Sequence, residues 1–135
     1  MSGSTLIPCL RYRDAPKAIE WLGRAFGLEP QLVVPGDDGV IHHAQLRLGQ
    51  GMVMLGSVMD SEYGRLMKEP QAVGGGTQSV YLVVREVDAV YARCIAAGAK
   101  IAMPLEAKDY GGKGFGCLDP EGHLWSIGDY DPWSD

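Results

Sequence analysis

The sequence predicts an α+β fold made of two tandem βαβββ modules, because the same order of elements can be followed twice along the chain. In each half a strand, a helix and three further strands follow one another. The segments AFGLEPQLVV and AAGAKIAMPL mark the same helix-to-strand junction in the two halves. We expect the modules to form a curved, partly open mixed sheet around a concave cleft, where small molecules usually bind.

Composition and charge exclude several classes of protein. The chain has 135 residues with 46% hydrophobic residues, which is enough for a buried core. Its formal net charge is −5, and lysines and arginines are scattered rather than clustered, so we expect no nucleic-acid partner. The sequence has no run of about 18 apolar residues, which is the length that a membrane-spanning helix requires, so we expect no membrane partner.

The N-terminal sequence and the cysteines indicate a cytoplasmic protein. MSGSTLIPCL lacks the basic segment and apolar stretch of a secretory signal. The three cysteines, Cys9, Cys94 and Cys117, are widely spaced and form no CxxC motif. We therefore expect reduced, buried thiols.

The first module is predicted over residues 1–57. LIPCLRYR alternates as a strand does, Asp14 is placed to cap a helix with Pro16 in its first turn, and Gly27 ends that helix. QLVV predicts a short strand and PGDDG a turn. VIHHAQLRL and MVMLGSV predict two strands joined by a tight GQG connection.

Residues 58–76 are predicted as a linker, since Pro70 and the glycines 74–76 interrupt the pattern. The second module is predicted over residues 77–135. SVYLVVRE begins it, Asp88 is the expected helix cap and Gly98 the expected stop. KIAMPL, GGKGFGCL and HLWSIGDY predict the three remaining strands, with DPEG as a turn before the last.

Three segments together resemble the vicinal-oxygen-chelate superfamily of glyoxalases, bleomycin-resistance proteins and extradiol dioxygenases. They are IHHAQLRLGQGMVML, SVYLVVREVDAVYARCIAAGAKI and LDPEGHLWSIGDY. The pair His43–Ala44 and DPEGHLWS resemble its PhnB-like branch, and the likeness extends from about Leu6 to Tyr130. It implies a homodimer with a pocket enclosed by the curved sheets. It does not imply one reaction, because the superfamily includes metal-dependent enzymes and metal-free binding proteins.

The resemblance also implies four positions for metal ligands, and these hold Ile7, Leu55, Ser79 and Ser126. Aliphatic side chains and hydroxyls are poor ligands for a catalytic divalent ion, which prefers imidazole, carboxylate or thiolate. A register shift by one residue would add only Gln78 as a possible ligand. We therefore expect no metal, although a divalent metal is the default of the superfamily.

Eight residues are candidates for contact with a ligand. They are Cys9, Arg11, His43, Gln45, Ser79, Tyr81, Phe115 and Ser126. His43 is the strongest candidate, either as a hydrogen-bond donor or general base, or as a structural imidazole. Arg11 is expected to hold an anionic group or to form a surface ion pair. Tyr81 and Phe115 are expected to stack on a planar ligand or to pack in the core, and Trp125 to pack in the core.

Three hypotheses follow for function. The first is a small-molecule-binding protein of the bleomycin-resistance kind, without a catalytic metal. The second is an enzyme, a lyase or dioxygenase of the superfamily, with atypical metal ligands or a metal-free mechanism at His43. The third is a regulatory or partner domain that has no enzymatic activity.

Overall fold

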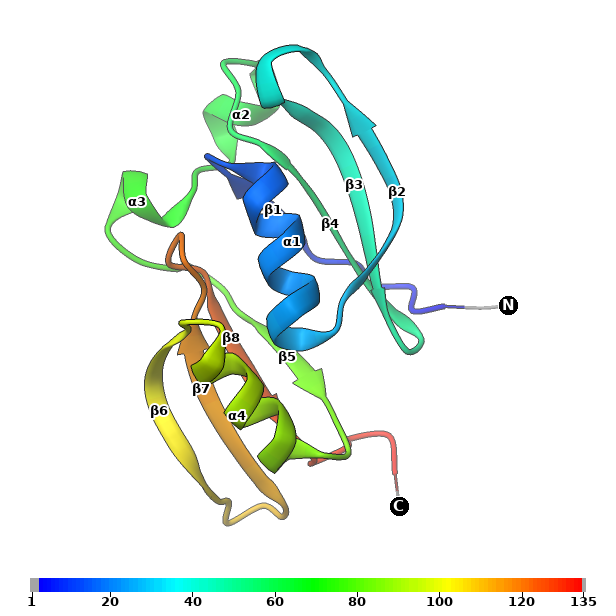
Figure 1. Cartoon of the computed structure of the whole chain (residues 1–135), viewed down its shortest axis with the longest axis vertical. Helices are drawn as coiled ribbons and strands as arrows, with labels where there is room; N and C mark the ends of the chain where they lie inside the picture. The colour runs from blue at the N-terminus through cyan, green and yellow to red at the C-terminus, as the bar shows by residue number, and fades with distance from the viewer. Residues whose placement is uncertain (1–2, 135) are drawn as a thin grey trace. The chain divides into compact units, whose positions relative to one another are not determined.

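The computed structural model of the chain describes residues 3–134. The chain divides between Gly74 and Gly75 into two compact units, residues 1–74 and 75–135. Each unit contains one four-stranded sheet with its own helix, and each is described below by itself (Figure 1). None of the helices within residues 3–134 is long and apolar enough to cross a membrane.

The first unit is a βαβββ module followed by two short helices. Its elements are β1 (Cys9–Tyr12), α1 (Ala15–Phe26), β2 (Glu29–Pro35), the 3-10 turn η1 (Asp37–Gly39), β3 (Ile41–Leu48), β4 (Gly51–Ser57), α2 (Glu62–Leu66) and α3 (Pro70–Val73). The strand order in the sheet is β1-β4-β3-β2. β1 runs parallel to β4, and the other neighbours are antiparallel, so the sheet is mixed as predicted.

Helix α1 begins and ends where the sequence predicts, and it covers one face of the first sheet. The side chain of Asp14 accepts a hydrogen bond from the backbone N–H of Lys17, and Gly27 has the positive φ of 79° that a left-handed C-cap requires. Alternate strand residues point to this face, as the period of two requires. The buried side chains there include Leu10, Tyr12, Ala44, Leu46, Val53 and Leu55, and α1 adds Trp21, Leu22 and Phe26.

The segment predicted as a linker, 58–76, contains the helices α2 and α3. It packs against the first module. Arg13 Nε lies 2.7 Å from Glu69 Oε2, and Pro70 at the start of α3 is buried. The segment is therefore attached to the first unit up to Gly74, where the first unit ends.

The second unit repeats the topology of the first. Its elements are β5 (Val80–Val83), α4 (Val87–Ala96), β6 (Lys100–Ala107), β7 (Lys113–Leu118) and β8 (Leu124–Gly128). The strand order is β5-β8-β7-β6, with β5 parallel to β8 and the other neighbours antiparallel. The predicted duplication of a βαβββ module is confirmed (Figure 1).

The prediction that Asp88 caps the second helix is wrong. The N-cap is Glu86, whose side chain makes no capping bond, and Asp88 lies within the first turn. There its carboxylate pairs with Lys113 Nζ on β7 at 2.9 Å. The helix ends as predicted near Gly98, which has a φ of 87°.

A buried carboxylate organises the turn before β8. Asp119 Oδ1 accepts hydrogen bonds from the backbone N–H groups of Glu121 and His123, and its Oδ2 accepts one from Trp125 Nε1 at 3.0 Å. Trp125 is fully buried, which confirms its predicted place in the core. The DPEGHLW segment therefore forms a turn that is bonded to a buried tryptophan, and the carboxylate of Asp119 has a structural role.

Candidate functional site

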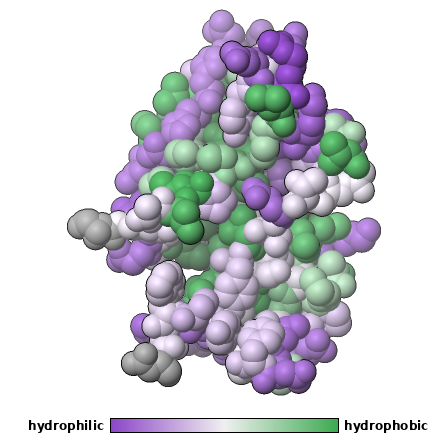
Figure 2. All heavy atoms as spheres, turned by 180° about the vertical axis from the view of Figure 1, so that it is seen from behind, coloured by the Kyte–Doolittle hydropathy of each residue, from purple (hydrophilic) through white to green (hydrophobic). Residues whose placement is uncertain are grey.

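The first sheet has a second face, opposite α1, on which the side chains are only partly buried. We call it the open face of the first sheet. In register across β1, β4 and β3 it presents Cys9, Met54 and Gln45, and β2 adds Leu32. Leu32 is 45% exposed and Figure 2, which shows the molecule from behind, displays further hydrophobic side chains at the surface.

A chain of three polar side chains crosses this open face from β3 to β2. His43 Nε2 lies 2.8 Å from Gln45 Oε1, and Gln45 Nε2 donates to Gln31 Oε1 at 2.8 Å. Because the Gln45 amide nitrogen donates to Gln31, the Gln45 amide oxygen is the atom that faces the imidazole. In a neutral His43, the proton is therefore on Nε2. Nδ1 of His43 is then an acceptor, and within residues 3–134 it has no hydrogen-bond partner.

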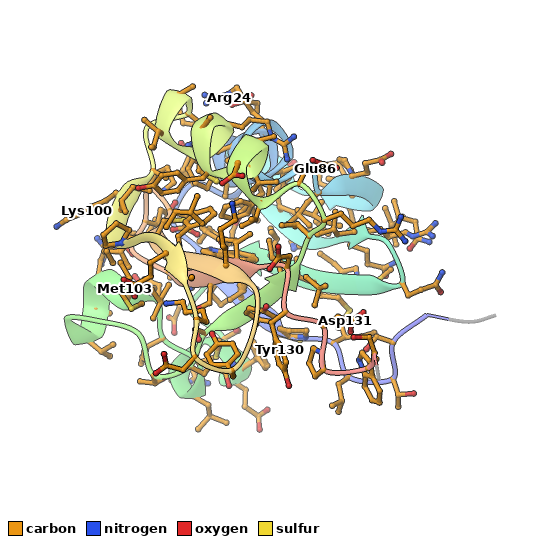
Figure 3. The ribbon with its side chains drawn as sticks, turned by 90° about the horizontal axis from the view of Figure 1, so that it is seen from below. Arg24, Glu86, Lys100, Met103, Tyr130 and Asp131 are labelled. Carbon is orange, nitrogen blue, oxygen red and sulfur yellow. The ribbon has the colours of Figure 1, made fainter. Side chains whose placement is uncertain are left out.

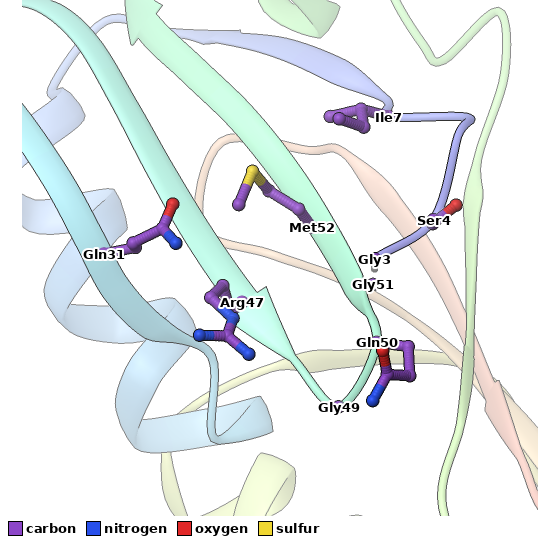
Figure 4. A pocket seen from close by; sticks show the side chains of 9 residues that line it. All are labelled: Gly3, Ser4, Ile7, Gln31, Arg47, Gly49, Gln50, Gly51 and Met52. Atoms are coloured by element: carbon purple, nitrogen blue, oxygen red, sulfur yellow. The ribbon is translucent and has the colours of Figure 1, made fainter. Parts of the chain in front are cut away.

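An open pocket of about 300 Å³ lies at one end of the same face (Figure 4). It is lined by Gly3, Ser4, Ile7, Gln31, Arg47, Gly49, Gln50, Gly51 and Met52. Gln31, Arg47 and Met52 project from three neighbouring strands. The backbone N–H of Ser4 donates to the Gln50 carbonyl at 2.7 Å, which ties the N-terminal segment to the β3–β4 turn and closes one side. Gln31 belongs both to the pocket and to the polar chain, so the two features are continuous.

Arg11 and Cys9 lie on β1 at the other side of the open face. Arg11 Nη1 donates to the carbonyl of Ser57 at 3.0 Å, and its guanidinium lies 4.4 Å from the ring centroid of Tyr63 in α2. A Cβ at Gly56 would lie 2.5 Å from this nitrogen, so a larger residue there would displace the guanidinium. Arg11 therefore links the sheet to the segment 58–76. Cys9 is half-buried, and its thiol lies 3.8 Å from the Ile7 carbonyl.

The second sheet also has an open face, opposite α4. Tyr81 on β5 lies opposite Ser126 on β8, and Tyr81 is 39% exposed. Its hydroxyl donates to the carbonyl of Tyr130 at 2.7 Å, and Figure 3 shows Tyr130 on the side of this sheet away from α4. Burial, with added repulsion from Tyr110 and Asp129, raises the pKa of Tyr81, so the phenol stays protonated and keeps this bond.

Two of the sequence-based assignments fall in the core. Phe115 on β7 is 3% exposed and packs edge-to-face with Tyr91 of α4 at 4.8 Å between ring centroids, so it follows the core alternative and not the stacking one. Leu55 is 3% exposed and pairs with Leu10 on the α1 face, whereas Ile7 lines the pocket on the open face. Leu55 therefore does not share a face with Ile7, and its neighbour Met54 does. Ser79 is exposed and lies just before β5.

The donor set does not fit a catalytic divalent metal. The four positions that the resemblance implies hold Ile7, Leu55, Ser79 and Ser126, and Met54 is the neighbour of Leu55 on the open face of the first sheet. These side chains supply no imidazole and no carboxylate. Within either unit, over residues 3–74 and 75–134, no three side chains of the His, Cys, Asp and Glu types come together to hold a metal.

Gln31 and Arg47 are functional residues that the sequence pattern does not single out. A register shift in the β2–β3 ladder between Pro30 and Leu32 leaves Gln31 without a strand partner and lets its amide meet Gln45. A bulge of this kind leaves no mark in a pattern of alternating residues. The alternation of HHAQLRL puts Arg47 on the same face as Gln45, and its contribution to a pocket depends on the neighbouring strands.

Comparison with known proteins identifies the family. The model of the Glyoxalase/Bleomycin resistance protein/Dioxygenase superfamily matches residues 5–127. The chain therefore belongs to this superfamily, as its resemblance implies.

Individual relatives agree with this membership. An uncharacterized protein of Mycobacterium bovis is 36% identical over 123 residues, which cover 91% of this chain and 81% of that protein. The crystal structure of TioX from Micromonospora sp. ML1 matches with a TM-score of 0.73 and 34% identity, over 93% of this chain and 98% of that one. The fosfomycin resistance protein FosX from Listeria monocytogenes matches with a TM-score of 0.69 over 98% and 97% of the two chains, and at 16% identity it shares the fold alone.

Proposed function

We propose that this chain is a small-molecule-binding protein of its superfamily, of the bleomycin-resistance kind and the PhnB-like branch, and that it works without the catalytic metal. The observation that carries the proposal is the open face of the first sheet. A hydrogen-bonded chain of His43, Gln45 and Gln31 lies there among partly exposed apolar side chains. A few oriented polar groups on an apolar surface are typical of small-molecule sites.

His43 is the central contact in this proposal. Its bond to Gln45 holds the imidazole in one orientation, and its Nδ1 faces no protein partner within residues 3–134. A ligand hydroxyl or amide N–H can donate to that nitrogen. Gln45 is bonded to His43, and Cys9 lies on the same face across β4, in register with Gln45. Tyr81 and Ser126 are the proposed contacts on the open face of the second sheet.

A thermal-shift screen with bleomycin and other planar aromatic compounds tests the proposal. A ligand at about 100 times its Kd stabilises the folded chain by about 2.7 kcal/mol. The variant His43→Ala is expected to weaken binding about fivefold, because one hydrogen bond is worth about 1 kcal/mol.

The matched control is His42→Ala. His42 is the exposed neighbour of His43 on β3, its imidazole lies beside Gly36 in the connection from β2 to β3, and it takes no part in the hydrogen-bonded chain of His43, Gln45 and Gln31. We expect His42→Ala to bind the same compounds as the unchanged chain. The proposal is wrong if no compound stabilises the chain, and the site is misplaced if both variants lose binding equally.

The second candidate is an enzyme of the superfamily, a lyase or a dioxygenase. The specific observation in its favour is the unpartnered Nδ1 of His43, which is placed to accept a proton from a bound molecule. Elemental analysis of the purified protein and turnover assays with and without a chelator separate the candidates. One metal per chain, or a turnover that the chelator or His43→Ala abolishes, would favour the enzyme.

A further inference from the structure

The pocket at the end of the open face contains one charged side chain, that of Arg47 (Figure 4). Among the described residues that line it, the other polar side chains are the neutral Gln31, Gln50 and Ser4. The Ser4 hydroxyl already donates to the Leu6 carbonyl at 2.7 Å. A single guanidinium and two amides therefore remain to meet a ligand.

Arg47 has no ion-pair or hydrogen-bond partner within residues 3–134. Glu29 lies directly opposite Arg47 in the β2–β3 register, and still the two side chains form no ion pair. Other arginines of the first unit are paired, as Arg13 is with Glu69 and Arg24 with Glu20. In a chain with a net charge of −5, an unpaired arginine at a pocket is a position for an anionic group.

We infer that this pocket is a subsite for a carboxylate carried on an apolar ligand. A planar guanidinium binds a carboxylate through two parallel hydrogen bonds. One positive charge matches a monoanion, whereas a phosphate dianion would need further cations that the pocket does not supply. The side chains of Ile7 and Met52 provide apolar walls beside Arg47. The inference rests on the proposed binding function and names the class of its ligand.

The position of Gln31 gives the direction of the ligand. Gln31 lines the pocket and accepts the hydrogen bond from Gln45, which is bonded to His43. A ligand with its carboxylate at Arg47 therefore extends along the open face towards His43. A volume of about 300 Å³ suits the charged end and part of the apolar body.

Isothermal titration calorimetry on the full chain tests the subsite with matched probes. The probes are benzoate, 2-naphthoate and decanoate, each compared with its primary amide, and inorganic phosphate. We expect the carboxylates to bind about tenfold or more tightly than their amides. The variant Arg47→Met keeps the aliphatic part of the side chain and is expected to lose this preference, and Arg47→Lys to retain part of it.

Glu29→Gln is the matched control, because it changes the charge of the cross-strand neighbour and leaves Arg47 in place. We expect this variant to keep or increase the preference for carboxylates. The inference is overturned if no carboxylate binds more tightly than its amide, or if Arg47→Met keeps the preference. Phosphate binding as tight as that of the carboxylates would also overturn it, since the apolar body would then contribute nothing.

The outcome is distinguishable from failure of the proposed function. If neutral planar compounds bind through His43 and carboxylates are not preferred, the carboxylate subsite is wrong and the proposed binding function is still supported. Absence of binding by every neutral compound and every carboxylate would remove both.

Discussion

At the scale of single residues, Asp119 and His43 illustrate two uses of a polar side chain. Asp119 is 4% exposed, and its carboxylate is occupied by two backbone N–H groups and the indole of Trp125. His43 is half-buried and uses only Nε2 within residues 3–134. A fully bonded buried group stabilises the fold, and a group with an open position can contact a ligand.

The change Asp119→Ala is expected to lower the free energy of unfolding by about 2–4 kcal/mol, because it leaves buried N–H groups without an acceptor. Urea unfolding followed by circular dichroism measures this. Asp131→Ala is the control, since Asp131 accepts a hydrogen bond from the backbone N–H of the exposed Trp133. A loss at Asp119 no larger than that at Asp131 would contradict a structural role for the buried carboxylate.

At the scale of elements, the segment 58–76 belongs with the first module, because two arginine side chains, one on β1 and one just after it, contact the segment. Arg11 stacks on Tyr63 of α2, and Arg13 pairs with Glu69 at the start of α3. The hydrogen bond from Arg13 is the main cause that lowers the pKa of Glu69 below 4.5, against the opposing effect of burial. The Glu69 side chain is 7% exposed, so solvent screens this pair less than the pairs at the surface.

Glu69→Gln is expected to lower the free energy of unfolding by about 1 kcal/mol at pH 7. Because the pKa of Glu69 is lower in the folded chain than in the unfolded chain, the unfolded chain takes up the proton first on acidification. The stabilisation is therefore complete above a pH of 4.5 and is lost as the pH falls through the folded pKa. Urea unfolding of both chains over a pH series should show their difference shrinking below that pH.

The control for this change is Glu20→Gln on α1. Glu20 also pairs with an arginine, Arg24, and its side chain is 63% exposed. Water screens this surface pair, so the change is expected to have a smaller effect throughout the pH series. A difference between the unchanged chain and Glu69→Gln that stays constant on acidification would contradict the assigned cause.

At the scale of the whole molecule, the two units repeat one topology with different local chemistry. In both sheets the first strand of the module runs parallel to the last strand. Helices α1 and α4 are each followed by a glycine of positive φ, Gly27 and Gly98. The first helix is capped by Asp14, and the second lacks a side-chain cap. The superfamily resemblance and this duplication lead us to propose that the chain acts as a homodimer.

Sedimentation equilibrium tests the homodimer at the scale to which it belongs. We expect a mass of twice the 14.6 kDa of one chain, independent of ligand. A mass equal to one chain at micromolar concentration would contradict the proposal. Such a result would leave the open face of the first sheet, and the tests of His43 and Arg47, unaffected.

The sequence by itself determined the duplicated βαβββ order, the family and the faces of some strand residues. Capping residues such as Asp14 and Gly27 act locally, and the period of two assigns Trp125 to the core and His43 to the open face. Only the tertiary structure decided which side chains on the open face meet. The bulge at Gln31, the lack of a partner for Arg47 within residues 3–134 and the burial of Phe115 depend on contacts between neighbouring strands and helices, which residue periodicity does not specify.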